Sequence, residues 1–291
     1  MAFPIRRPTD IEAAPHSRGV LRAIERNERG RAPHIVALGG GTGLPAVLEG
    51  LAELAAEKSE KDPYAVTGIV TVTDDGGSSG FLRQQLGILP PGDARNCLLA
   101  LIDRDSRFRE LLQHRLNEGP GVVGHPVGNL LLAALAQQTG DFSRAIEQLG
   151  SMIGSRGRVL PSTLEDVRLR AELESGKTVN GETEIVGDVS PVRRLSLHPS
   201  PRPLPETLAA LVNADGIVIG PGSLYTSVLP NLLIEGVAAT IHGVNAVRIY
   251  VANLMTEPGE TEHYTLDDHL RVIRSHTGFD LFDYILVNRR P

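Results

Sequence analysis

Two glycine-rich loops, each at the end of an apolar run, constrain the fold of this chain more than any other feature. The run His34–Leu38 leads into Gly39-Gly-Gly-Thr-Gly43, and the run Thr71–Thr73 leads into Asp74-Asp-Gly-Gly-Ser-Ser-Gly80. Helical patterns follow both loops. A strand that ends in glycines and passes into a helix directs backbone N–H groups and the positive end of the helix dipole toward an anion. The pair therefore predicts one nucleotide-like ligand lying across two adjacent strand ends.

Strand and helix patterns alternate along most of the remaining chain. We expect helices at 44–57, 94–102 and 129–136, a further helix starting at the Thr265–Asp268 capping pattern, and strands at 34–38, 66–73, 216–220, 247–253 and 284–288. Strands that alternate with helices form a mainly parallel sheet with helices on both faces. The predicted fold class is therefore α/β and Rossmann-like, and its ligands bind beyond the carboxyl ends of the strands.

Changes of pattern divide the chain into four parts. Residues 1–31 carry seven arginines without a sustained apolar period, which is typical of a flexible N-terminal arm. Residues 32–154 form the predicted nucleotide-binding α/β core, and residues 206–291 continue it. Between them, residues 155–205 alternate apolar and polar positions and predict a small β-rich insertion, with strands at 167–173, 178–186 and 192–197.

Composition excludes several classes of protein. The 291 residues include 41% hydrophobic and 22% charged residues, as in an ordinary globular protein, and the net charge of −6 argues against a nucleic-acid-binding surface. Cys97 is the only cysteine, so neither an intramolecular disulfide nor a thiolate metal cluster is possible. The apolar runs are shorter than the ~18 residues that a membrane span needs. We expect a cytoplasmic protein that binds neither nucleic acid nor membrane.

The first glycine loop fits a relaxed dinucleotide-binding fingerprint. Gly41-Thr-Gly-Leu-Pro-Ala46 matches G-x-G-x-x-G/A between a predicted strand and a predicted helix. The Lys-Ser/Thr ending of a P-loop is absent, which argues against ATP hydrolysis. The loop is either a phosphate cradle or a turn needed only for close packing of strand and helix. The candidate contacts are Gly40, Gly41, Thr42 and Gly43.

The second loop combines carboxylates with small residues. One of the two carboxylates, Asp74 or Asp75, suits a ribose hydroxyl or a Mg²⁺ ion bound to phosphate, and we take Asp75 as the candidate metal ligand. Gly77, Ser78 and Ser79 suit phosphate oxygens. The alternative is that an aspartate only caps the following helix.

Later segments add polar residues to the same predicted edge of the sheet. Arg95 is a candidate phosphate fork. Asp93 fits either a helix cap or a site residue, His125 either a base or a structural role, and Tyr225 a stacking platform. The remaining candidate contacts are Asn96, Asn129, Gly222 and Ser223.

Taken in order, these loops resemble the family that joins the 2-phospho-L-lactate transferases (CofD-like) to the YvcK-type gluconeogenesis factors. The matching motifs are Gly39-Gly-Gly-Thr-Gly43, Asp74-Asp-Gly-Gly-Ser-Ser-Gly80, Pro90-Pro-Gly-Asp93 with Arg95-Asn96, Gly128-Asn129, Ile219-Gly-Pro-Gly-Ser-Leu-Tyr-Thr-Ser227, and Asn253-Leu-Met-Thr256 with Pro258-Gly-Glu-Thr261. The forms of the second and fifth motifs are closer to the gluconeogenesis factors. Phe81 departs from the pattern, because an arginine is expected there, whereas Arg83 is kept.

The resemblance implies a Rossmann-like fold, binding of UDP-sugars such as UDP-N-acetylglucosamine, and a cytoplasmic role in gluconeogenic carbon metabolism and cell shape. The transferase branch instead implies transfer of a phospholactyl group from a nucleotide-activated donor, assisted by a metal ion. A small nucleotide or nucleotide sugar is thus the expected partner, and a second copy of the chain is a further candidate partner.

Three hypotheses follow. The first is a nucleotide-sugar-binding regulatory protein, favoured because no nucleophile–base pair is evident in the sequence. The second is a Mg²⁺-dependent transferase in which Asp74 and Asp75 hold the metal. The third is a dinucleotide-dependent oxidoreductase, weakened because the carboxylates lie more than thirty residues after Gly41, beyond the usual ~20.

Overall fold

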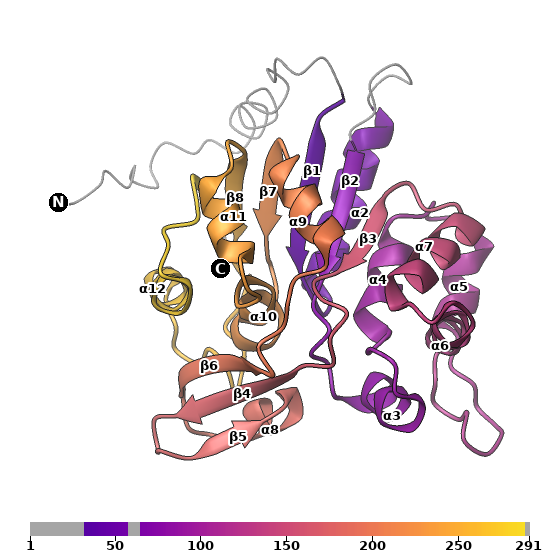
Figure 1. The fold of residues 1–291 in the computed structure, drawn as a ribbon, viewed down its shortest axis with the longest axis horizontal. Coiled ribbons are helices and arrows are strands. Elements are labelled where there is room, and N and C mark those ends of the chain that lie inside the picture. The colour runs from indigo at the N-terminus through magenta and orange to yellow at the C-terminus, as the bar shows by residue number, and fades with distance from the viewer. Residues whose placement is uncertain (1–31, 58–64, 289–291) are drawn as a thin grey trace.

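The computed structural model describes residues 32–57 and 65–288 (Figure 1). The predicted arm, residues 1–31, lies outside the described residues. Six parallel strands form the main sheet in the order β3-β2-β1-β7-β8-β9. Their bounds are β1 (His34–Gly39), β2 (Ala65–Val70), β3 (Arg158–Pro161), β7 (Gly216–Ile219), β8 (Val247–Val251) and β9 (Tyr284–Leu286). This is the strand order of doubly wound folds, with its switch point between β1 and β7.

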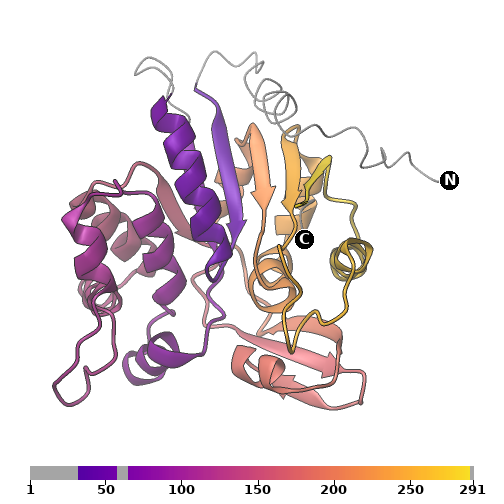
Figure 2. The ribbon, with the colours of Figure 1, turned by 180° about the vertical axis from the view of Figure 1, so that it is seen from behind.

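Helices cover both faces of this sheet, as predicted. Alternate residues of β1 point to opposite faces, so Ile35 and Ala37 enter one apolar cluster while Val36 and Leu38 enter the other. The first cluster is completed by α2 (Gly43–Glu57), α4 (Gly92–Ala100), α6 (Val127–Thr139) and α7 (Phe142–Ile153), and the second by α9 (Pro205–Val212), α10 (Leu229–Leu232), α11 (Val237–Gly243) and α12 (Leu266–Thr277). Figure 1 shows α9 and α11 in front of the sheet, and Figure 2 shows α2 on the opposite face.

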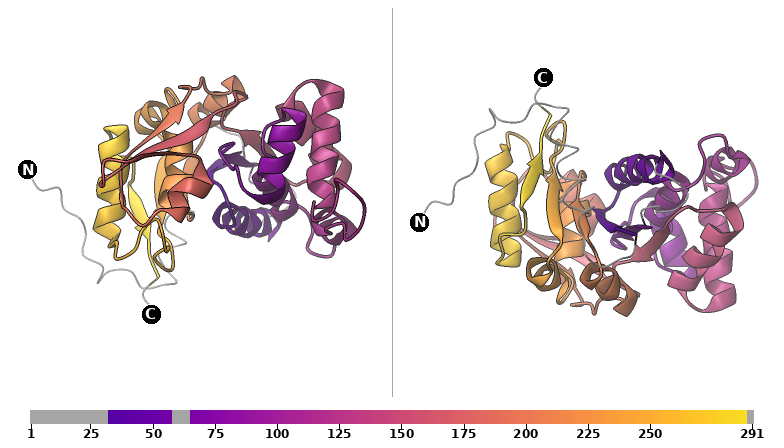
Figure 3. Two further views of the ribbon diagram at one scale, coloured as in Figure 1. Left: turned by 90° about the horizontal axis from the view of Figure 1, so that it is seen from below. Right: turned by 90° about the horizontal axis from the view of Figure 1, so that it is seen from above.

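Three further strands form a separate antiparallel sheet in the order β5-β4-β6. They are β4 (Arg168–Leu173), β5 (Thr178–Asn180) and β6 (Val192–His198), inside the range 155–205 expected for the β-rich insertion. Residues 158–161, which open that range, pair with β2 of the main sheet instead. Viewed toward the carboxyl ends of the main strands, the small sheet lies over the half of the molecule built by β7 and β8 (Figure 3, left).

The strand predicted at 178–186 is wrong beyond residue 180. Gly181 follows β5 with a φ of +89°, a left-handed conformation that favours glycine and ends the extended run. Residues 182–187 then form the short helix α8 (Glu182–Gly187). The predicted capping pattern is confirmed, because Thr265 accepts a hydrogen bond from the Asp268 N–H while Asp268 accepts one from the Thr265 N–H.

Among the described residues, no single helix is long and apolar enough to cross a membrane. The apolar segments 224–232 and 237–243 pass that test only as a pair, which is bent by 72°. Within the described residues, the further helices α3 (Gly77–Leu86) and α5 (Arg107–Gln113) both lie between β2 and β3 in the chain.

The loops after β1 and β7 meet backbone to backbone. A Cβ atom on Gly43 would overlap the carbonyl group of Pro221. Hydrogen bonds extend the ladder of the sheet into this region, from Gly220 N–H to the Leu38 carbonyl (3.0 Å) and from Thr71 N–H to the Gly39 carbonyl (3.1 Å). The first residue of α2 therefore sets how closely the two loops approach across the switch point.

Replacing Gly43 by alanine should force these loops apart. We expect Gly43→Ala to lower the free energy of unfolding by about 1–3 kcal/mol, the usual cost of overpacking against atoms that cannot move away. The matched control is Gly50→Ala in the same helix, where the added methyl group meets open space; it should be neutral or stabilising by up to about 1 kcal/mol. Urea unfolding of both variants measures the difference, and equal stabilities would contradict the close approach.

Candidate functional site

The first glycine loop is held by a carboxylate from another helix. Gly41 N–H donates to Asp93 Oδ2 at 2.9 Å, and Asp93 belongs to the first turn of α4. Gly40 has no room for a side chain, because a Cβ atom there would lie 2.8 Å from the same carboxylate oxygen. Asp93 therefore orients the loop rather than capping its own helix, whose N-cap is Pro91. Thr42 is exposed at the loop tip.

The two aspartates of the second loop form hydrogen bonds with different parts of the structure. Asp74 Oδ1 accepts from Gly76 N–H at 2.9 Å and shapes the turn into α3. Asp75 Oδ1 accepts from both the N–H and the hydroxyl of Thr183, at 3.0 and 2.8 Å, and so ties this loop to α8 of the small sheet. Neither carboxylate caps α3, whose N-cap Gly76 makes no side-chain capping bond. Gly77 is exposed where α3 begins, so this helix N-terminus suits an anion.

Ser78 and Ser79, predicted together as phosphate contacts, point to different partners. The Ser79 side chain is buried, and its hydroxyl oxygen accepts from Gly92 N–H at 3.1 Å. The Ser78 hydroxyl lies 2.7 Å from His125 Nδ1 and accepts from the Asn129 amide at 3.0 Å. Ser78 and His125 form the kind of nucleophile–base pair that sequence reasoning did not find, because 47 residues separate them.

Arg95 continues this network and fixes the orientation of the Asn129 amide. Its guanidinium donates to Asn129 Oδ1 at 2.8 Å and to Asn96 Oδ1 at 2.6 Å. Because Arg95 can only donate, Asn129 turns its NH₂ group toward Ser78. The Ser78 hydroxyl also forms a hydrogen bond with His125 Nδ1. Three separate segments, namely the second glycine loop, the first turns of α4 and residues 125–129, thus meet in one chain of hydrogen bonds.

The charge of Arg95 is buried, and none of the carboxylates in residues 32–57 and 65–288 forms an ion pair with it. The side chain is 9% exposed, forms no ion pair with any described residue, and leaves Nε enclosed without a hydrogen-bond partner. Burial lowers the pKa of the Arg95 guanidinium and the nearby charge of Arg115 lowers it further, while the more weakly acting charges of Asp93 and Asp74 raise it. A buried cation in this condition is costly, and an anionic ligand would relieve it.

The loop after β7 is braced from two sides. Asn253, just after β8, accepts from Gly222 N–H at 2.8 Å and donates to the Gly222 carbonyl at 3.0 Å. Glu260 accepts from Tyr225 N–H at 3.0 Å and from the Thr226 hydroxyl at 2.7 Å, so it holds the start of the π-helical turn Leu224–Val228. Ser223 is the N-cap of that turn and makes no capping bond with its side chain.

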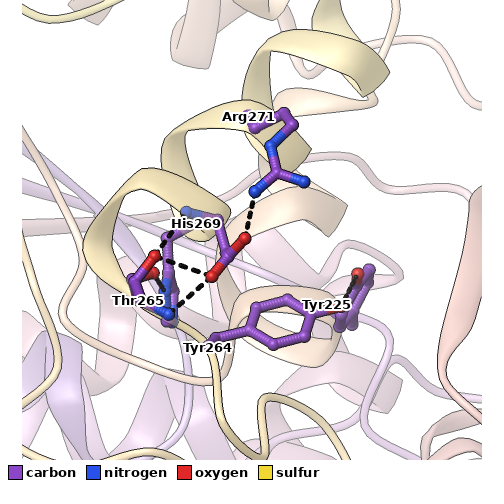
Figure 4. Close-up of polar contacts among 6 residues, drawn as sticks. Tyr225, Tyr264, Thr265, His269 and Arg271 are labelled. Atoms are coloured by element: carbon purple, nitrogen blue, oxygen red, sulfur yellow. Dashed lines mark hydrogen bonds and ion pairs between the residues drawn. The ribbon is translucent and has the colours of Figure 1, made fainter.

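Tyr225 is not the stacking platform that its position suggests. It is 1% exposed, and its hydroxyl contacts the Val192 carbonyl at 3.3 Å and the Tyr264 hydroxyl at 2.9 Å. Tyr264 reaches Tyr225 from beside the capping box of α12 (Figure 4). The residue thus joins the β7 loop to β6 and α12, and a ligand base has no access to its ring.

Comparison with known proteins places this arrangement in a family. The family 2-phospho-L-lactate transferase CofD matches residues 35–291. The chain belongs to the CofD family. It is 48% identical over 273 residues to a putative gluconeogenesis factor of Nostoc sp., and the match covers 93% of this chain but 58% of that protein. It is 46% identical over 260 residues to the gluconeogenesis factor of Bacillus subtilis, and that match covers 89% of this chain and 80% of the relative. The crystal structure of protein BH3568 from Bacillus halodurans has a TM-score of 0.84 at 45% identity, covering 90% of this chain and 82% of that one.

In this CofD-family chain, Phe81, which stands where the family pattern has an arginine, packs against a residue of the candidate site. Phe81 is 45% exposed and packs against the His125 ring, with ring centroids 5.0 Å apart. Arg83, the retained arginine, is buried and donates to Asp166 and to the Val167 carbonyl, just before β4. Arg83 therefore joins α3 to the small sheet and contributes no charge to the candidate site.

Carboxyl groups also converge on the site of this CofD-family protein. Burial raises the pKa of Glu182 to about 8, with Asp74 and then Asp93 as the next causes, and burial raises the pKa of Asp93 to about 6. Among the described residues, no group of three or more His, Cys, Asp or Glu side chains is arranged to hold a metal ion. Asp75 as a ligand of Mg²⁺ stays a prediction, since its carboxylate already binds Thr183. Sequence reasoning missed Glu182 because it lies in the insertion.

The raised pKa of Asp93 predicts a pH-dependent stability. The folded protein holds this proton up to about pH 6, whereas an unfolded aspartate releases it near 3.8, so wild type loses stability as the pH rises through that window. Asp93→Asn keeps an acceptor for Gly41 N–H but has no proton to lose. We therefore expect the free energy of unfolding of the variant, minus that of wild type, to increase by roughly 1–2 kcal/mol from about pH 5 to about pH 8. The control is Asp105→Asn, an exposed position, and a pH-independent difference for Asp93→Asn would contradict the assignment.

Proposed function

We propose that this chain is a nucleotide-sugar-binding regulatory protein of carbon metabolism and cell shape, acting in the cytoplasm, with UDP-sugars such as UDP-N-acetylglucosamine as its ligand class. The observation that carries the proposal is Arg95, a buried guanidinium that no described carboxylate pairs. It lies on the hydrogen-bond chain that includes Asn129 and Ser78, at the uncapped start of α3. Relatives named gluconeogenesis factors support a role in carbon metabolism.

Each part of such a ligand has a matching partner. The diphosphate suits the backbone of Gly40–Gly43, the start of α3 and the Arg95 guanidinium. Sugar and ribose hydroxyls suit the carboxyl groups of Asp74 and Glu182. A carboxyl group that keeps its proton near neutral pH, as the pKa of Glu182 at about 8 allows, donates as well as accepts and does not repel the diphosphate.

Isothermal titration with UDP-N-acetylglucosamine tests this function. We expect Arg95→Gln to weaken binding at least about tenfold, since a hydrogen bond to a charged group contributes about 1.5–3 kcal/mol. The control is Arg104→Gln, an exposed arginine that pairs with Glu49 and Glu53 on α2; it should bind like wild type. The proposal is wrong if UDP-N-acetylglucosamine gives no heat while other nucleotides bind, or if Arg95→Gln binds as tightly as wild type.

A second candidate is a Mg²⁺-dependent transferase of the phospholactyl type that uses a nucleotide-activated donor. The hydrogen bond between Ser78 and His125 favours it, because a histidine beside a hydroxyl at a helix N-terminus can accept a proton during group transfer. Asp75 would hold the metal ion, which polarises the attacked phosphorus.

This candidate predicts turnover. GTP- or UTP-linked donors should be consumed only with Mg²⁺, and Asp75→Asn should reduce the rate by at least about a hundredfold, as expected for loss of a catalytic electrostatic contact. Donor consumption followed by ³¹P NMR, with Asp105→Asn as the control for a lost exposed carboxylate, measures this. UDP-sugar binding without any consumption would reject the transferase and leave the binding function intact.

A further inference from the structure

A groove of about 720 Å³ lies between the small sheet and α12, outside the strand-end site. One wall is β6, the edge strand of the small sheet, and the other is the last turn of α12. The two walls are joined where Leu195 N–H donates to His276 Nε2 at 3.0 Å. Small-molecule sites commonly occupy about 300–1,000 Å³, so the groove has the size of a ligand site.

The charge of the groove is positive although the whole chain is acidic. Arg193 pairs with Glu172 at 2.9 Å, but both side chains are largely exposed, so the pair is weak. Arg194 lies opposite Glu172 in the register of β4 and β6, yet it forms no ion pair with any described residue. Two guanidinium groups therefore face a single carboxylate. An anionic ligand would find one arginine unpaired and a second held only loosely.

The neutral lining defines the rest of the ligand. Leu197 and Leu233, both partly buried, supply an apolar floor, whereas the Leu195 side chain is buried in the core beneath it. His276 accepts from Leu195 N–H through Nε2 and contacts the Val272 carbonyl through Nδ1 at 2.8 Å. Both ring nitrogens are thus engaged, and the imidazole adds a flat, uncharged surface. Ser200 is exposed beside them and offers a hydroxyl donor.

We propose that this groove is a second ligand site, for a small molecule that joins a phosphate or carboxylate group to an aromatic or apolar body. Arg194 binds the anionic group, with Arg193 beside it, while the body lies on the leucine floor and the imidazole. His276 also packs edge-on against Tyr225, with ring centroids 6.3 Å apart. The ligand would therefore touch a ring that supports the loop carrying Ser223, which suits an effector.

Ligand-observed NMR with two simple probes tests the site. Phenyl phosphate and benzoate both carry an anion on an aromatic ring, and phenol is the uncharged control. We expect at least one of the anions, but not phenol, to bind wild type, and its affinity to fall about tenfold or more in Arg194→Glu and in the milder Arg194→Gln. Whichever anion binds more tightly identifies the anionic group of the ligand class.

Two further variants locate the binding. Arg144→Glu, an exposed position on α7, controls for the loss of a surface arginine and should bind like wild type. Arg95→Gln alters only the strand-end site and should also retain the probe, so failure of the proposed UDP-sugar function would leave this result unchanged. The inference is overturned if neither anion binds wild type, if phenol binds equally well, or if binding is lost in Arg95→Gln and kept in Arg194→Glu.

Discussion

The approach of two loop backbones at the switch point is the constraint on which the rest of the site depends. Only a residue without a side chain at 43 lets α2 start against the Pro221 carbonyl, and only glycine at 40 fits beside Asp93. Asp93 then holds Gly41 N–H, which places the acidic first turn of α4 under the first loop. Arg95, two residues further along that helix, packs instead against Gly128 and donates to Asn129 at the start of α6. Helix α4 therefore connects the first glycine loop, through Asp93, to the buried cation of the candidate site.

The small sheet belongs to this site as well, through two separate ties. Asp75 binds Thr183 at the start of α8, and the Tyr225 hydroxyl contacts the Val192 carbonyl of β6. One tie comes from the β2 loop and the other from the β7 loop, on the two sides of the switch point. A sheet held at both points brings Glu182 toward Asp74 and Asp93, where burial and their charges raise its pKa to about 8. The insertion thus contributes a proton-bearing group that the main sheet lacks.

The features that could be predicted well are those determined by residues close together in the sequence. Five of the six main-sheet strands, the glycine loops, and the capping box at Thr265 depend on apolar periodicity or on residues three apart, whereas β3 falls in the range expected for the insertion. The errors arise where a distant partner decides. Tyr225 suits a stacking platform by its position but is covered by β6 and Tyr264, and residues 182–187 leave the strand at Gly181, where Thr183 binds Asp75. For Asp93 the sequence leaves a cap and a site residue open, because its partner Gly41 lies 52 residues away. Pairing of Ser78 with His125 likewise requires the α3–α6 packing, which no local pattern encodes.

The two kinds of charge in the site limit what it can hold. A bare anion would be attracted by Arg95 and the start of α3 but repelled by Asp74 and Asp93. A bare cation would be attracted by the two aspartates but repelled by Arg95 and the start of α3. A ligand that carries a diphosphate at one end and hydroxyl groups at the other satisfies both, because hydroxyls donate to ionised carboxylates and accept from a protonated Glu182. Raising the pH through the pKa of Glu182 adds a negative charge near the diphosphate. The carboxyl groups therefore favour a sugar over a second phosphate at that end, which supports the proposal of a nucleotide sugar over a nucleoside triphosphate as the ligand of this site.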